Sequence, residues 1–91
     1  MSILSKKSIL VTGGTGSIGT ALVKKAINDN AKLIRIFSND ENGLYEMETE
    51  YGNYKNIEYV IGDIQNKEIV SEIVKDIDII FHAAALKQVP A

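Results

Sequence analysis

Short runs of β-branched and apolar residues alternate along the chain with segments of helical periodicity. Four runs have the length and composition of buried parallel strands: residues 8–12, 33–37, 57–61 and 78–82. After the first run, Ile18, Leu22 and Ala26 recur four residues apart, which predicts one amphipathic helix of about three turns. The pattern therefore predicts strands and helices in strict alternation, β-α-β-α-β-α-β.

Two further helical segments have recognisable ends. Asn39 or Asp40 can cap a short second helix, and Gly52 is expected to end it. Its inward residues would be Leu44, Met47 and Tyr51. Asn66 can cap a third helix. Its buried face is expected to consist of Ile69, Val70, Ile73 and Val74.

This alternation with short connections predicts an α/β fold, a Rossmann-type parallel sheet of four strands in the order 3-2-1-4 with right-handed crossovers. A chain of 91 residues makes at most one domain. The fourth strand would have no partner on its outer side, which leaves Ile79, Ile80 and Phe81 on an open edge. We therefore expect either self-association through this edge or disorder of this region.

A glycine-rich segment separates the first predicted strand from the first predicted helix. It has the form Gly13-x-x-Gly16-x-x-Gly19, in the strand-to-helix context that makes the pattern informative. Gly13 would permit the tight turn, Gly16 the close approach of a pyrophosphate, and Gly19 the packing of helix against sheet. Backbone N–H groups at the helix start would then face the phosphates, and Thr15 and Ser17 would add hydroxyl donors.

The other strand ends offer matching chemistry, because ligands of such sheets bind outside the carboxyl ends of the strands. Ser38, Asn39 and Asp40 follow the second strand, about 20 residues after the glycines, where ribose selection is expected. Asp63 and Ile64 follow the third strand and could flank an adenine ring. The small residues Ala83 and Ala84 follow the fourth. These features predict that residues 1–91 are the amino-terminal half of a dinucleotide-binding domain, without a substrate domain.

Composition narrows the choice of function. Ten basic and twelve acidic residues give a net charge of −2, which argues against nucleic acid or an anionic membrane as partner. The sequence has no cysteine and a single histidine, His82, so no metal site is predicted. No apolar stretch reaches the ~18–20 residues of a membrane span, and no signal-peptide pattern is present. We therefore expect a soluble, cytoplasmic protein.

The string from Val11 to Gly19 resembles the extended short-chain dehydrogenase/reductases. Together with residues 37–41 and 82–90, it resembles their polysaccharide-biosynthesis branch, whose best-known members are UDP-N-acetylglucosamine 4,6-dehydratases, some of which also epimerise C5. The segment Ala-Ala-Leu-Lys-x-Val-Pro, which contains Lys87, is the most specific part of the likeness. UDP-sugar 4-epimerases share the glycine loop but usually lack that segment.

The resemblance implies a role for each of these residues. Lys87 would contact both the cofactor and the UDP-sugar substrate, and Ala83 and Ala84 would lie near the nicotinamide. The pyrophosphate would be held by Thr15, Gly16, Ser17 and Ile18, the ribose by Ser38, Asn39 and Asp40, and the adenine by Asp63 and Ile64. Many relatives have arginine where this chain has Asn39. The family favours NADP, with NAD as the alternative.

The implied reaction removes a hydride from C4 of the hexose, eliminates water across C5 and C6 and returns the hydride to C6. It needs a tyrosine whose pKa is lowered by a lysine one helical turn away, together with an acid and a base. The only such spacing here, Tyr51 and Lys55, lies in a loop region and is interpreted as a coincidence, so no catalytic residue is predicted in this chain. Three hypotheses remain open: part of a dehydratase or 4-epimerase, a stand-alone NAD(P)-binding module without turnover, or a truncated piece with an empty or misassembled site.

Overall fold

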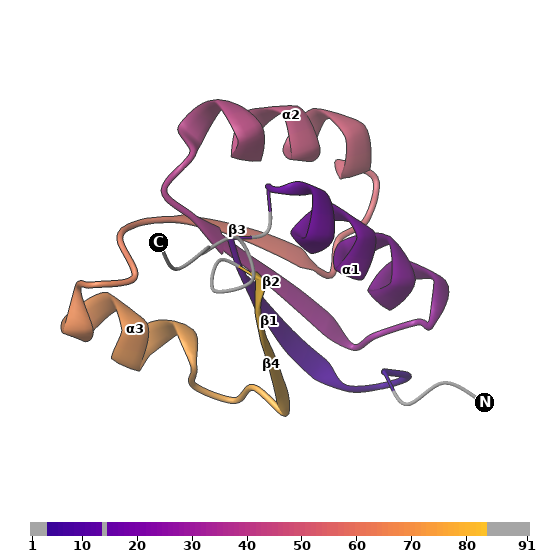
Figure 1. Cartoon of the computed structure of the whole chain (residues 1–91). Helices are drawn as coiled ribbons and strands as arrows, with labels where there is room; N and C mark the ends of the chain where they lie inside the picture. Colours follow the sequence, from indigo (N-terminus) through magenta and orange to yellow (C-terminus); the bar gives the residue numbers. More distant parts are fainter. Residues whose placement is uncertain (1–3, 14, 84–91) are drawn as a thin grey trace.

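The computed structural model describes residues 4–13 and 15–83. Strands and helices alternate without exception, in the order β1 (Ser8–Thr12), α1 (Ser17–Asn28), β2 (Leu33–Ser38), α2 (Glu41–Tyr51), β3 (Ile57–Ile61), α3 (Lys67–Ile73) and β4 (Ile79–His82). The strands form one parallel sheet in the order β3-β2-β1-β4 (Figure 1). The predicted Rossmann-type fold and strand order are confirmed.

Strand register brings the carboxyl ends of all four strands to one side of the sheet. Thr12 lies opposite Phe37 of β2 and His82 of β4, and Ser38 lies opposite Ile61 of β3. We call this side the carboxyl edge of the sheet. Every loop that leaves a strand here and enters a helix therefore starts beside the others.

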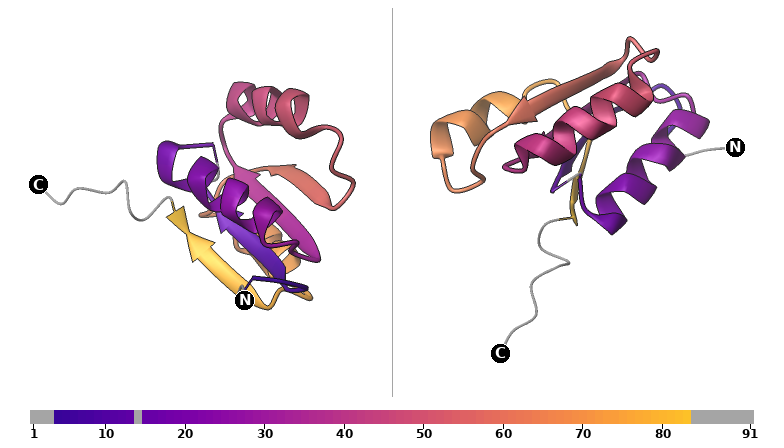
Figure 2. Two further views of the ribbon diagram at one scale, coloured as in Figure 1. Left: turned by 90° about the vertical axis from the view of Figure 1, so that its right-hand side faces the viewer. Right: turned by 90° about the horizontal axis from the view of Figure 1, so that it is seen from above.

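Helices α1 and α2 cover one face of the sheet, and α3 covers the other (Figure 2). Side chains alternate between the two faces along each strand, so that Ile9, Val11, Ile34 and Ile36 pack beneath α1 and α2. These four isoleucine and valine side chains are fully buried. The larger of the two cores lies on this face.

The core beneath α3 is smaller. Leu10 of β1, Phe37 of β2 and Ile73 of α3 are its buried members, and Val60, Ile69 and Ile77 pack around them at partial exposure. Arg35 fastens the end of α3 to the sheet, because its Nη1 donates to the carbonyl oxygens of Ile73 (2.7 Å) and Lys75 (3.1 Å). Its Nε also pairs with Glu58 Oε1 at 2.7 Å.

The predicted helix caps are present. The Asp40 carboxylate accepts from the Gly43 N–H at the start of α2, and Gly52 follows the last residue of that helix. The Asn66 side chain accepts from the N–H groups of Glu68 and Ile69 at the start of α3. Local sequence signals therefore predicted the starts of α2 and α3 and the end of α2 correctly.

Two residues assigned to buried helix faces are exposed instead. Ile18 is 43% exposed, because the buried positions of α1 are Gly19, Val23 and Ala26, so the face toward the sheet begins at a glycine. Val74 is 37% exposed, because α3 ends at Ile73 and Val74 is already its carboxyl cap. Both predictions were wrong for the side chain, although Ile18 lies in α1 as expected, whereas Val74 lies just after α3.

Strand β4 is an edge strand, as predicted. Ile79 and Phe81 pack against the core under α1, whereas Ile80 points to the opposite face and is 52% exposed. Helix α3 packs over Leu10, Phe37 and β3 and leaves Ile80 uncovered. Within the described residues, no helix is long and apolar enough to cross a membrane.

Candidate nucleotide-binding site

The loop after β1 turns sharply at Gly13, whose φ of 71° lies in the left-handed region. The Gly13 N–H donates to the carbonyl of Phe37 at 2.7 Å, and the Gly13 carbonyl accepts from the Gly16 N–H at 3.3 Å. A side chain at position 13 would strain this conformation. Gly13 therefore directs the chain away from the sheet and back toward the start of α1, as the sequence predicted.

Helix α1 begins without a capping side chain. Its N-cap is Gly16, in extended conformation, and its first turn contains no acidic residue. By contrast, α2 and α3 each have a side-chain cap and a glutamate in the first turn. The N–H groups of Ser17, Ile18 and Gly19 precede the first helical bond, from Thr20 N to Gly16 O, and can bind an anion with the helix dipole behind them. This end of α1 fits a pyrophosphate.

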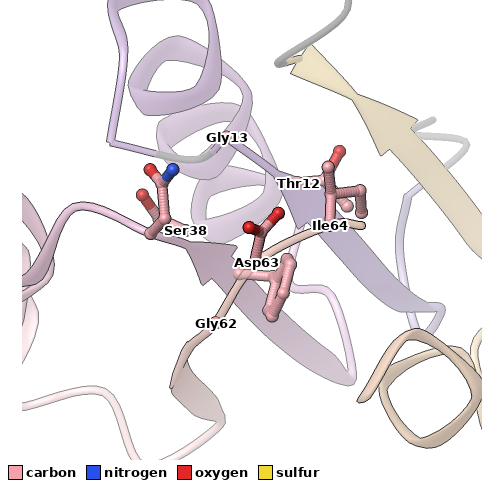
Figure 3. A pocket seen from close by; sticks show the side chains of 8 residues that line it. Thr12, Gly13, Ser38, Gly62, Asp63 and Ile64 are labelled. Atoms are coloured by element: carbon pink, nitrogen blue, oxygen red, sulfur yellow. The ribbon is translucent and has the colours of Figure 1, made fainter. Parts of the chain in front are cut away.

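A pocket opens beside this loop at the carboxyl edge (Figure 3). Figure 3 shows the Asp63 carboxylate between Ser38 and Ile64, which come from different strand ends. Eight residues line the pocket: Thr12, Gly13, Phe37, Ser38, Asn39, Gly62, Asp63 and Ile64. Five of them, Gly13, Ser38, Asn39, Asp63 and Ile64, were predicted from the sequence as cofactor contacts.

A closed ring of hydrogen bonds joins the glycine loop to the end of β2. The Asp40 N–H donates to Ser38 Oγ (3.0 Å), and Thr15 Oγ1 donates to Asp40 Oδ2 (3.3 Å). Because the Thr15 proton points to the carboxylate, the remaining 3.1 Å contact has Ser38 Oγ donating to Thr15 Oγ1. We call Thr15, Ser38 and Asp40 the ribose corner, since Ser38 and Asp40 are the residues for which the sequence predicts contact with the adenosine ribose. Thr15 was predicted to contact the pyrophosphate, and its hydroxyl bonds to these two residues in the structure.

Asp63 has a structural contact as well as a place in the pocket. Its Oδ1 accepts from the Gln65 N–H at 2.9 Å, which fixes the turn between β3 and α3. The neighbouring Ile64 side chain is 41% exposed. An exposed apolar side chain next to a turn carboxylate can provide a surface for one side of a planar base, and the adenine contact stays a prediction.

At the end of β4, His82 Nδ1 lies 2.5 Å from Thr12 Oγ1. This contact joins β1 and β4 and makes His82 a hydrogen-bonded residue at the end of a strand. Ala83 is buried directly after the strand. The predicted contacts of Ala84 and Lys87 lie outside the described residues.

The sequence reasoning missed Thr12, Phe37 and Gly62, which also line the pocket. Each immediately precedes a residue that was predicted. A Cβ at Gly62 would lie 2.7 Å from Ile69 Cδ1 and 2.9 Å from Phe37 Cε1, so glycine is required for the loop to approach the Phe37 ring. A prediction that included the last residues of each strand as well as the loop after it would have found all three of these pocket residues.

The pair Tyr51 and Lys55 lies away from this site. Tyr51 ends α2 next to the start of β3, at the side of the sheet opposite the carboxyl edge. Burial, and secondly the charge of Glu50, raises the pKa of the Tyr51 hydroxyl, the reverse of what a catalytic tyrosinate needs. The interpretation of this spacing as a coincidence agrees with the structure. Among the described residues, no three His, Asp or Glu side chains are grouped to hold a metal ion.

Comparison with known proteins identifies the relatives of this chain. The family model described as "Polysaccharide biosynthesis protein" matches residues 9–91. An uncharacterized membrane protein of Methanocaldococcus jannaschii is 46% identical over 92% of this chain and 25% of its own length. A UDP-glucose 4-epimerase of Rickettsia bellii is 44% identical over 92% of this chain and 26% of its own. The chain thus spans about a quarter of the length of these relatives.

Solved structures show the same fold. The X-ray structure of Pen from Bacillus thuringiensis superposes with a TM-score of 0.89 at 35% identity, over 98% of this chain and 28% of that one. The Bordetella bronchiseptica enzyme WbmF, crystallised in complex with NAD+, superposes with a TM-score of 0.70 at 18% identity, over 89% and 24% of the two chains.

Proposed function

Because the chain belongs to the polysaccharide biosynthesis protein family, we propose that it forms the NAD(P)-binding part of an enzyme that modifies the hexose of a nucleotide sugar. The proposal rests on one observation. The uncapped start of α1 and the pocket between β1, β2 and β3 lie side by side at the carboxyl edge. A dinucleotide needs this combination, an anion site next to a pocket for adenosine.

The described residues would bind and orient the cofactor. The first-turn N–H groups of α1 would hold the pyrophosphate, the ribose corner would contact the adenosine ribose, and Asp63 with Ile64 would flank the adenine. A bound nicotinamide cofactor supplies the transient removal and return of a hydride at the sugar. Among the described residues, no tyrosine–lysine pair lies at the carboxyl edge to move the accompanying proton.

Two reactions fit this role. A 4,6-dehydratase, with or without epimerisation at C5, is supported by the resemblance of residues 82–90, including Lys87. A UDP-sugar 4-epimerase is supported by the name of the Rickettsia relatives, which are 44% and 43% identical to this chain. Both reactions begin with hydride removal at C4. We place the dehydratase first because the epimerases usually lack the lysine segment.

Isothermal titration calorimetry of the 91-residue chain tests cofactor binding. Titrations with NAD, NADP, UDP-N-acetylglucosamine and UDP-glucose should show binding of a dinucleotide. Dinucleotide binding without sugar-nucleotide binding supports the stand-alone binding module, whereas binding of both supports the enzyme part, in which Lys87 would contact both molecules. Absence of any dinucleotide binding would overturn the proposed function and leave a structural role.

The reaction itself is tested by incubating the protein with NAD(P) and either UDP-sugar and following the products by NMR. Loss of water to a 4-keto-6-deoxy sugar supports the dehydratase, and inversion at C4 without loss of water supports the epimerase. Cofactor binding without any product is the result expected of the 91-residue chain by itself, as part of an enzyme or as a stand-alone binding module, because no catalytic residue is predicted in it.

A further inference from the structure

The ribose corner holds a fixed carboxylate. Asp40 Oδ1 accepts from the Gly43 N–H at 3.0 Å, and Asp40 Oδ2 accepts from Thr15 at 3.3 Å. Glycine at position 43 is what makes this arrangement fit, since a Cβ there would lie 2.4 Å from Asp40 Oδ2 and 2.8 Å from Thr15 Cβ. The carboxylate is therefore held between the glycine loop and the first turn of α2.

Within the part of the chain that the structure describes, Asp40 forms no salt bridge with a lysine or arginine. Among residues 4–13 and 15–83, no lysine or arginine lines the pocket, which instead contains Asp63. The sequence has one arginine, Arg35, and its guanidinium is bound to Glu58 and to the end of α3. The residue after Ser38, where many relatives have arginine, is the exposed and uncharged Asn39.

The start of α2 does not supply the missing positive charge. Its dipole would attract a phosphate, but Asp40 already caps it and Glu41 adds a second carboxylate in the first turn. A 2′-phosphate carries a charge of about −1.5 to −2 at neutral pH. It would therefore meet acceptors and like charges at this corner, where a 2′-hydroxyl would meet acceptors to which it can donate.

We infer that the site selects a dinucleotide with an unphosphorylated adenosine ribose, NAD rather than NADP, through Asp40 and the absence of a cation at Asn39. The inference rests on the proposed function and makes it more specific. It departs from the expectation drawn from the family resemblance. Asp40 and Ser38 would accept hydrogen bonds from the ribose hydroxyls, and Thr15 would keep the carboxylate in place.

Competitive calorimetry of the 91-residue chain measures the selectivity. The probes are NAD and NADP, together with 5′-AMP and 2′,5′-ADP, which differ only at the ribose 2′ position. We expect NAD to bind at least about tenfold more tightly than NADP, the size of effect that like charges near a protein surface produce. The preference for 5′-AMP over 2′,5′-ADP should have the same direction.

Two variants locate the selectivity. Asn39→Arg provides a guanidinium for the 2′-phosphate and should tighten NADP about tenfold while leaving NAD within about twofold. Asp40→Asn removes the charge and keeps an amide oxygen that can cap α2. It should therefore reduce the preference for NAD over NADP without unfolding the helix. The matched control is Asn53→Arg, an exposed position in the turn before β3, at the opposite side of the sheet.

The outcomes separate this inference from the proposed function. The inference is supported if the unaltered chain prefers NAD and if Asn39→Arg, but not Asn53→Arg, raises the affinity for NADP. Equal or tighter binding of NADP by the unaltered chain, or an equal gain from Asn53→Arg, overturns the inference and leaves the proposed function standing. Binding of neither dinucleotide overturns both.

Discussion

Gly62 lies so close to the ring of Phe37 that a Cβ at position 62 would fall 2.9 Å from Phe37 Cε1. Phe37 belongs both to the core beneath α3 and to the lining of the pocket. The glycine thus allows the loop after β3 to rest on a core side chain. Packing beneath the sheet and the shape of the pocket are coupled at this contact.

We predict that Gly62→Ala lowers stability by about 1–3 kcal/mol, the usual cost of overpacking, and also weakens dinucleotide binding. The added methyl group would displace the Phe37 ring or the end of Ile69. Urea denaturation and calorimetry measure the two effects. Ile69→Val removes the Cδ1 atom nearest to the new methyl group, so the double variant should regain part of the lost stability. A stable Gly62→Ala protein with unchanged affinity would contradict the coupling.

Substitutions at Gly13 and Gly16 should have different consequences. Gly13 has a positive φ, so Gly13→Ala should cost about 1–2 kcal/mol of stability. Gly16 has a φ of −79° and a ψ of 176°, which alanine adopts readily, so Gly16→Ala should cost less, about 1 kcal/mol or under. Its methyl group would instead obstruct the pyrophosphate and reduce affinity. Equal effects of the two changes on stability would show that the loop differs from this description.

Arg35 is predicted to stabilise the end of α3 more through its bonds to carbonyl groups than through its ion pair. Arg35→Met should cost roughly 2 kcal/mol, because it removes charged hydrogen bonds to Ile73 and Lys75. Glu58→Gln should cost about 1 kcal/mol or less, because the Glu58 side chain is half exposed. Urea denaturation of both variants gives the comparison. A larger loss from Glu58→Gln would reverse the assignment.

Self-association through the β4 edge stays a prediction that sedimentation velocity can test. Ile80→Lys replaces the exposed apolar side chain of that edge strand with a charged one and should shift the protein toward monomer. Ile61→Lys is the matched control, since Ile61 is similarly exposed on β3, the strand at the other edge. A monomeric unaltered chain at all concentrations, or an equal response to both changes, would contradict association through β4.

The fold could be read from the sequence because each local signal agreed with the others. The strand runs, the caps at Asp40 and Asn66 and the glycine loop all pointed to one arrangement, which the structure shows. The exceptions arose where hydrophobicity alone was used. Ile18 is apolar but lies in the first turn of α1, and Gly19, which has no side chain to score, takes the buried position.

The sequence predicts which strand ends form the site, but it does not predict the hydrogen bonds that join the residues of the site to one another. Thr15 donates a hydrogen bond to Asp40, which lies 25 residues further along the chain. This bond forms because α2 closely approaches the glycine loop. That approach requires the absence of a side chain at Gly43, and no local sequence signal indicates this requirement. The partnership of Phe37 and Gly62 was missed for the same reason, because it is a three-dimensional contact between different strands.

The most direct test of the nucleotide site is an NMR titration of the 15N-labelled chain with NAD. The account predicts that the largest amide shifts fall on Ser17, Ile18, Asn39, Asp40 and Asp63, all at the carboxyl edge of the sheet. Amides at the opposite side, such as those of Lys32, Asn53 and Asp76, should not move. Shifts centred on that opposite side, or no shifts at saturating NAD, would contradict the assignment of this edge as a dinucleotide site.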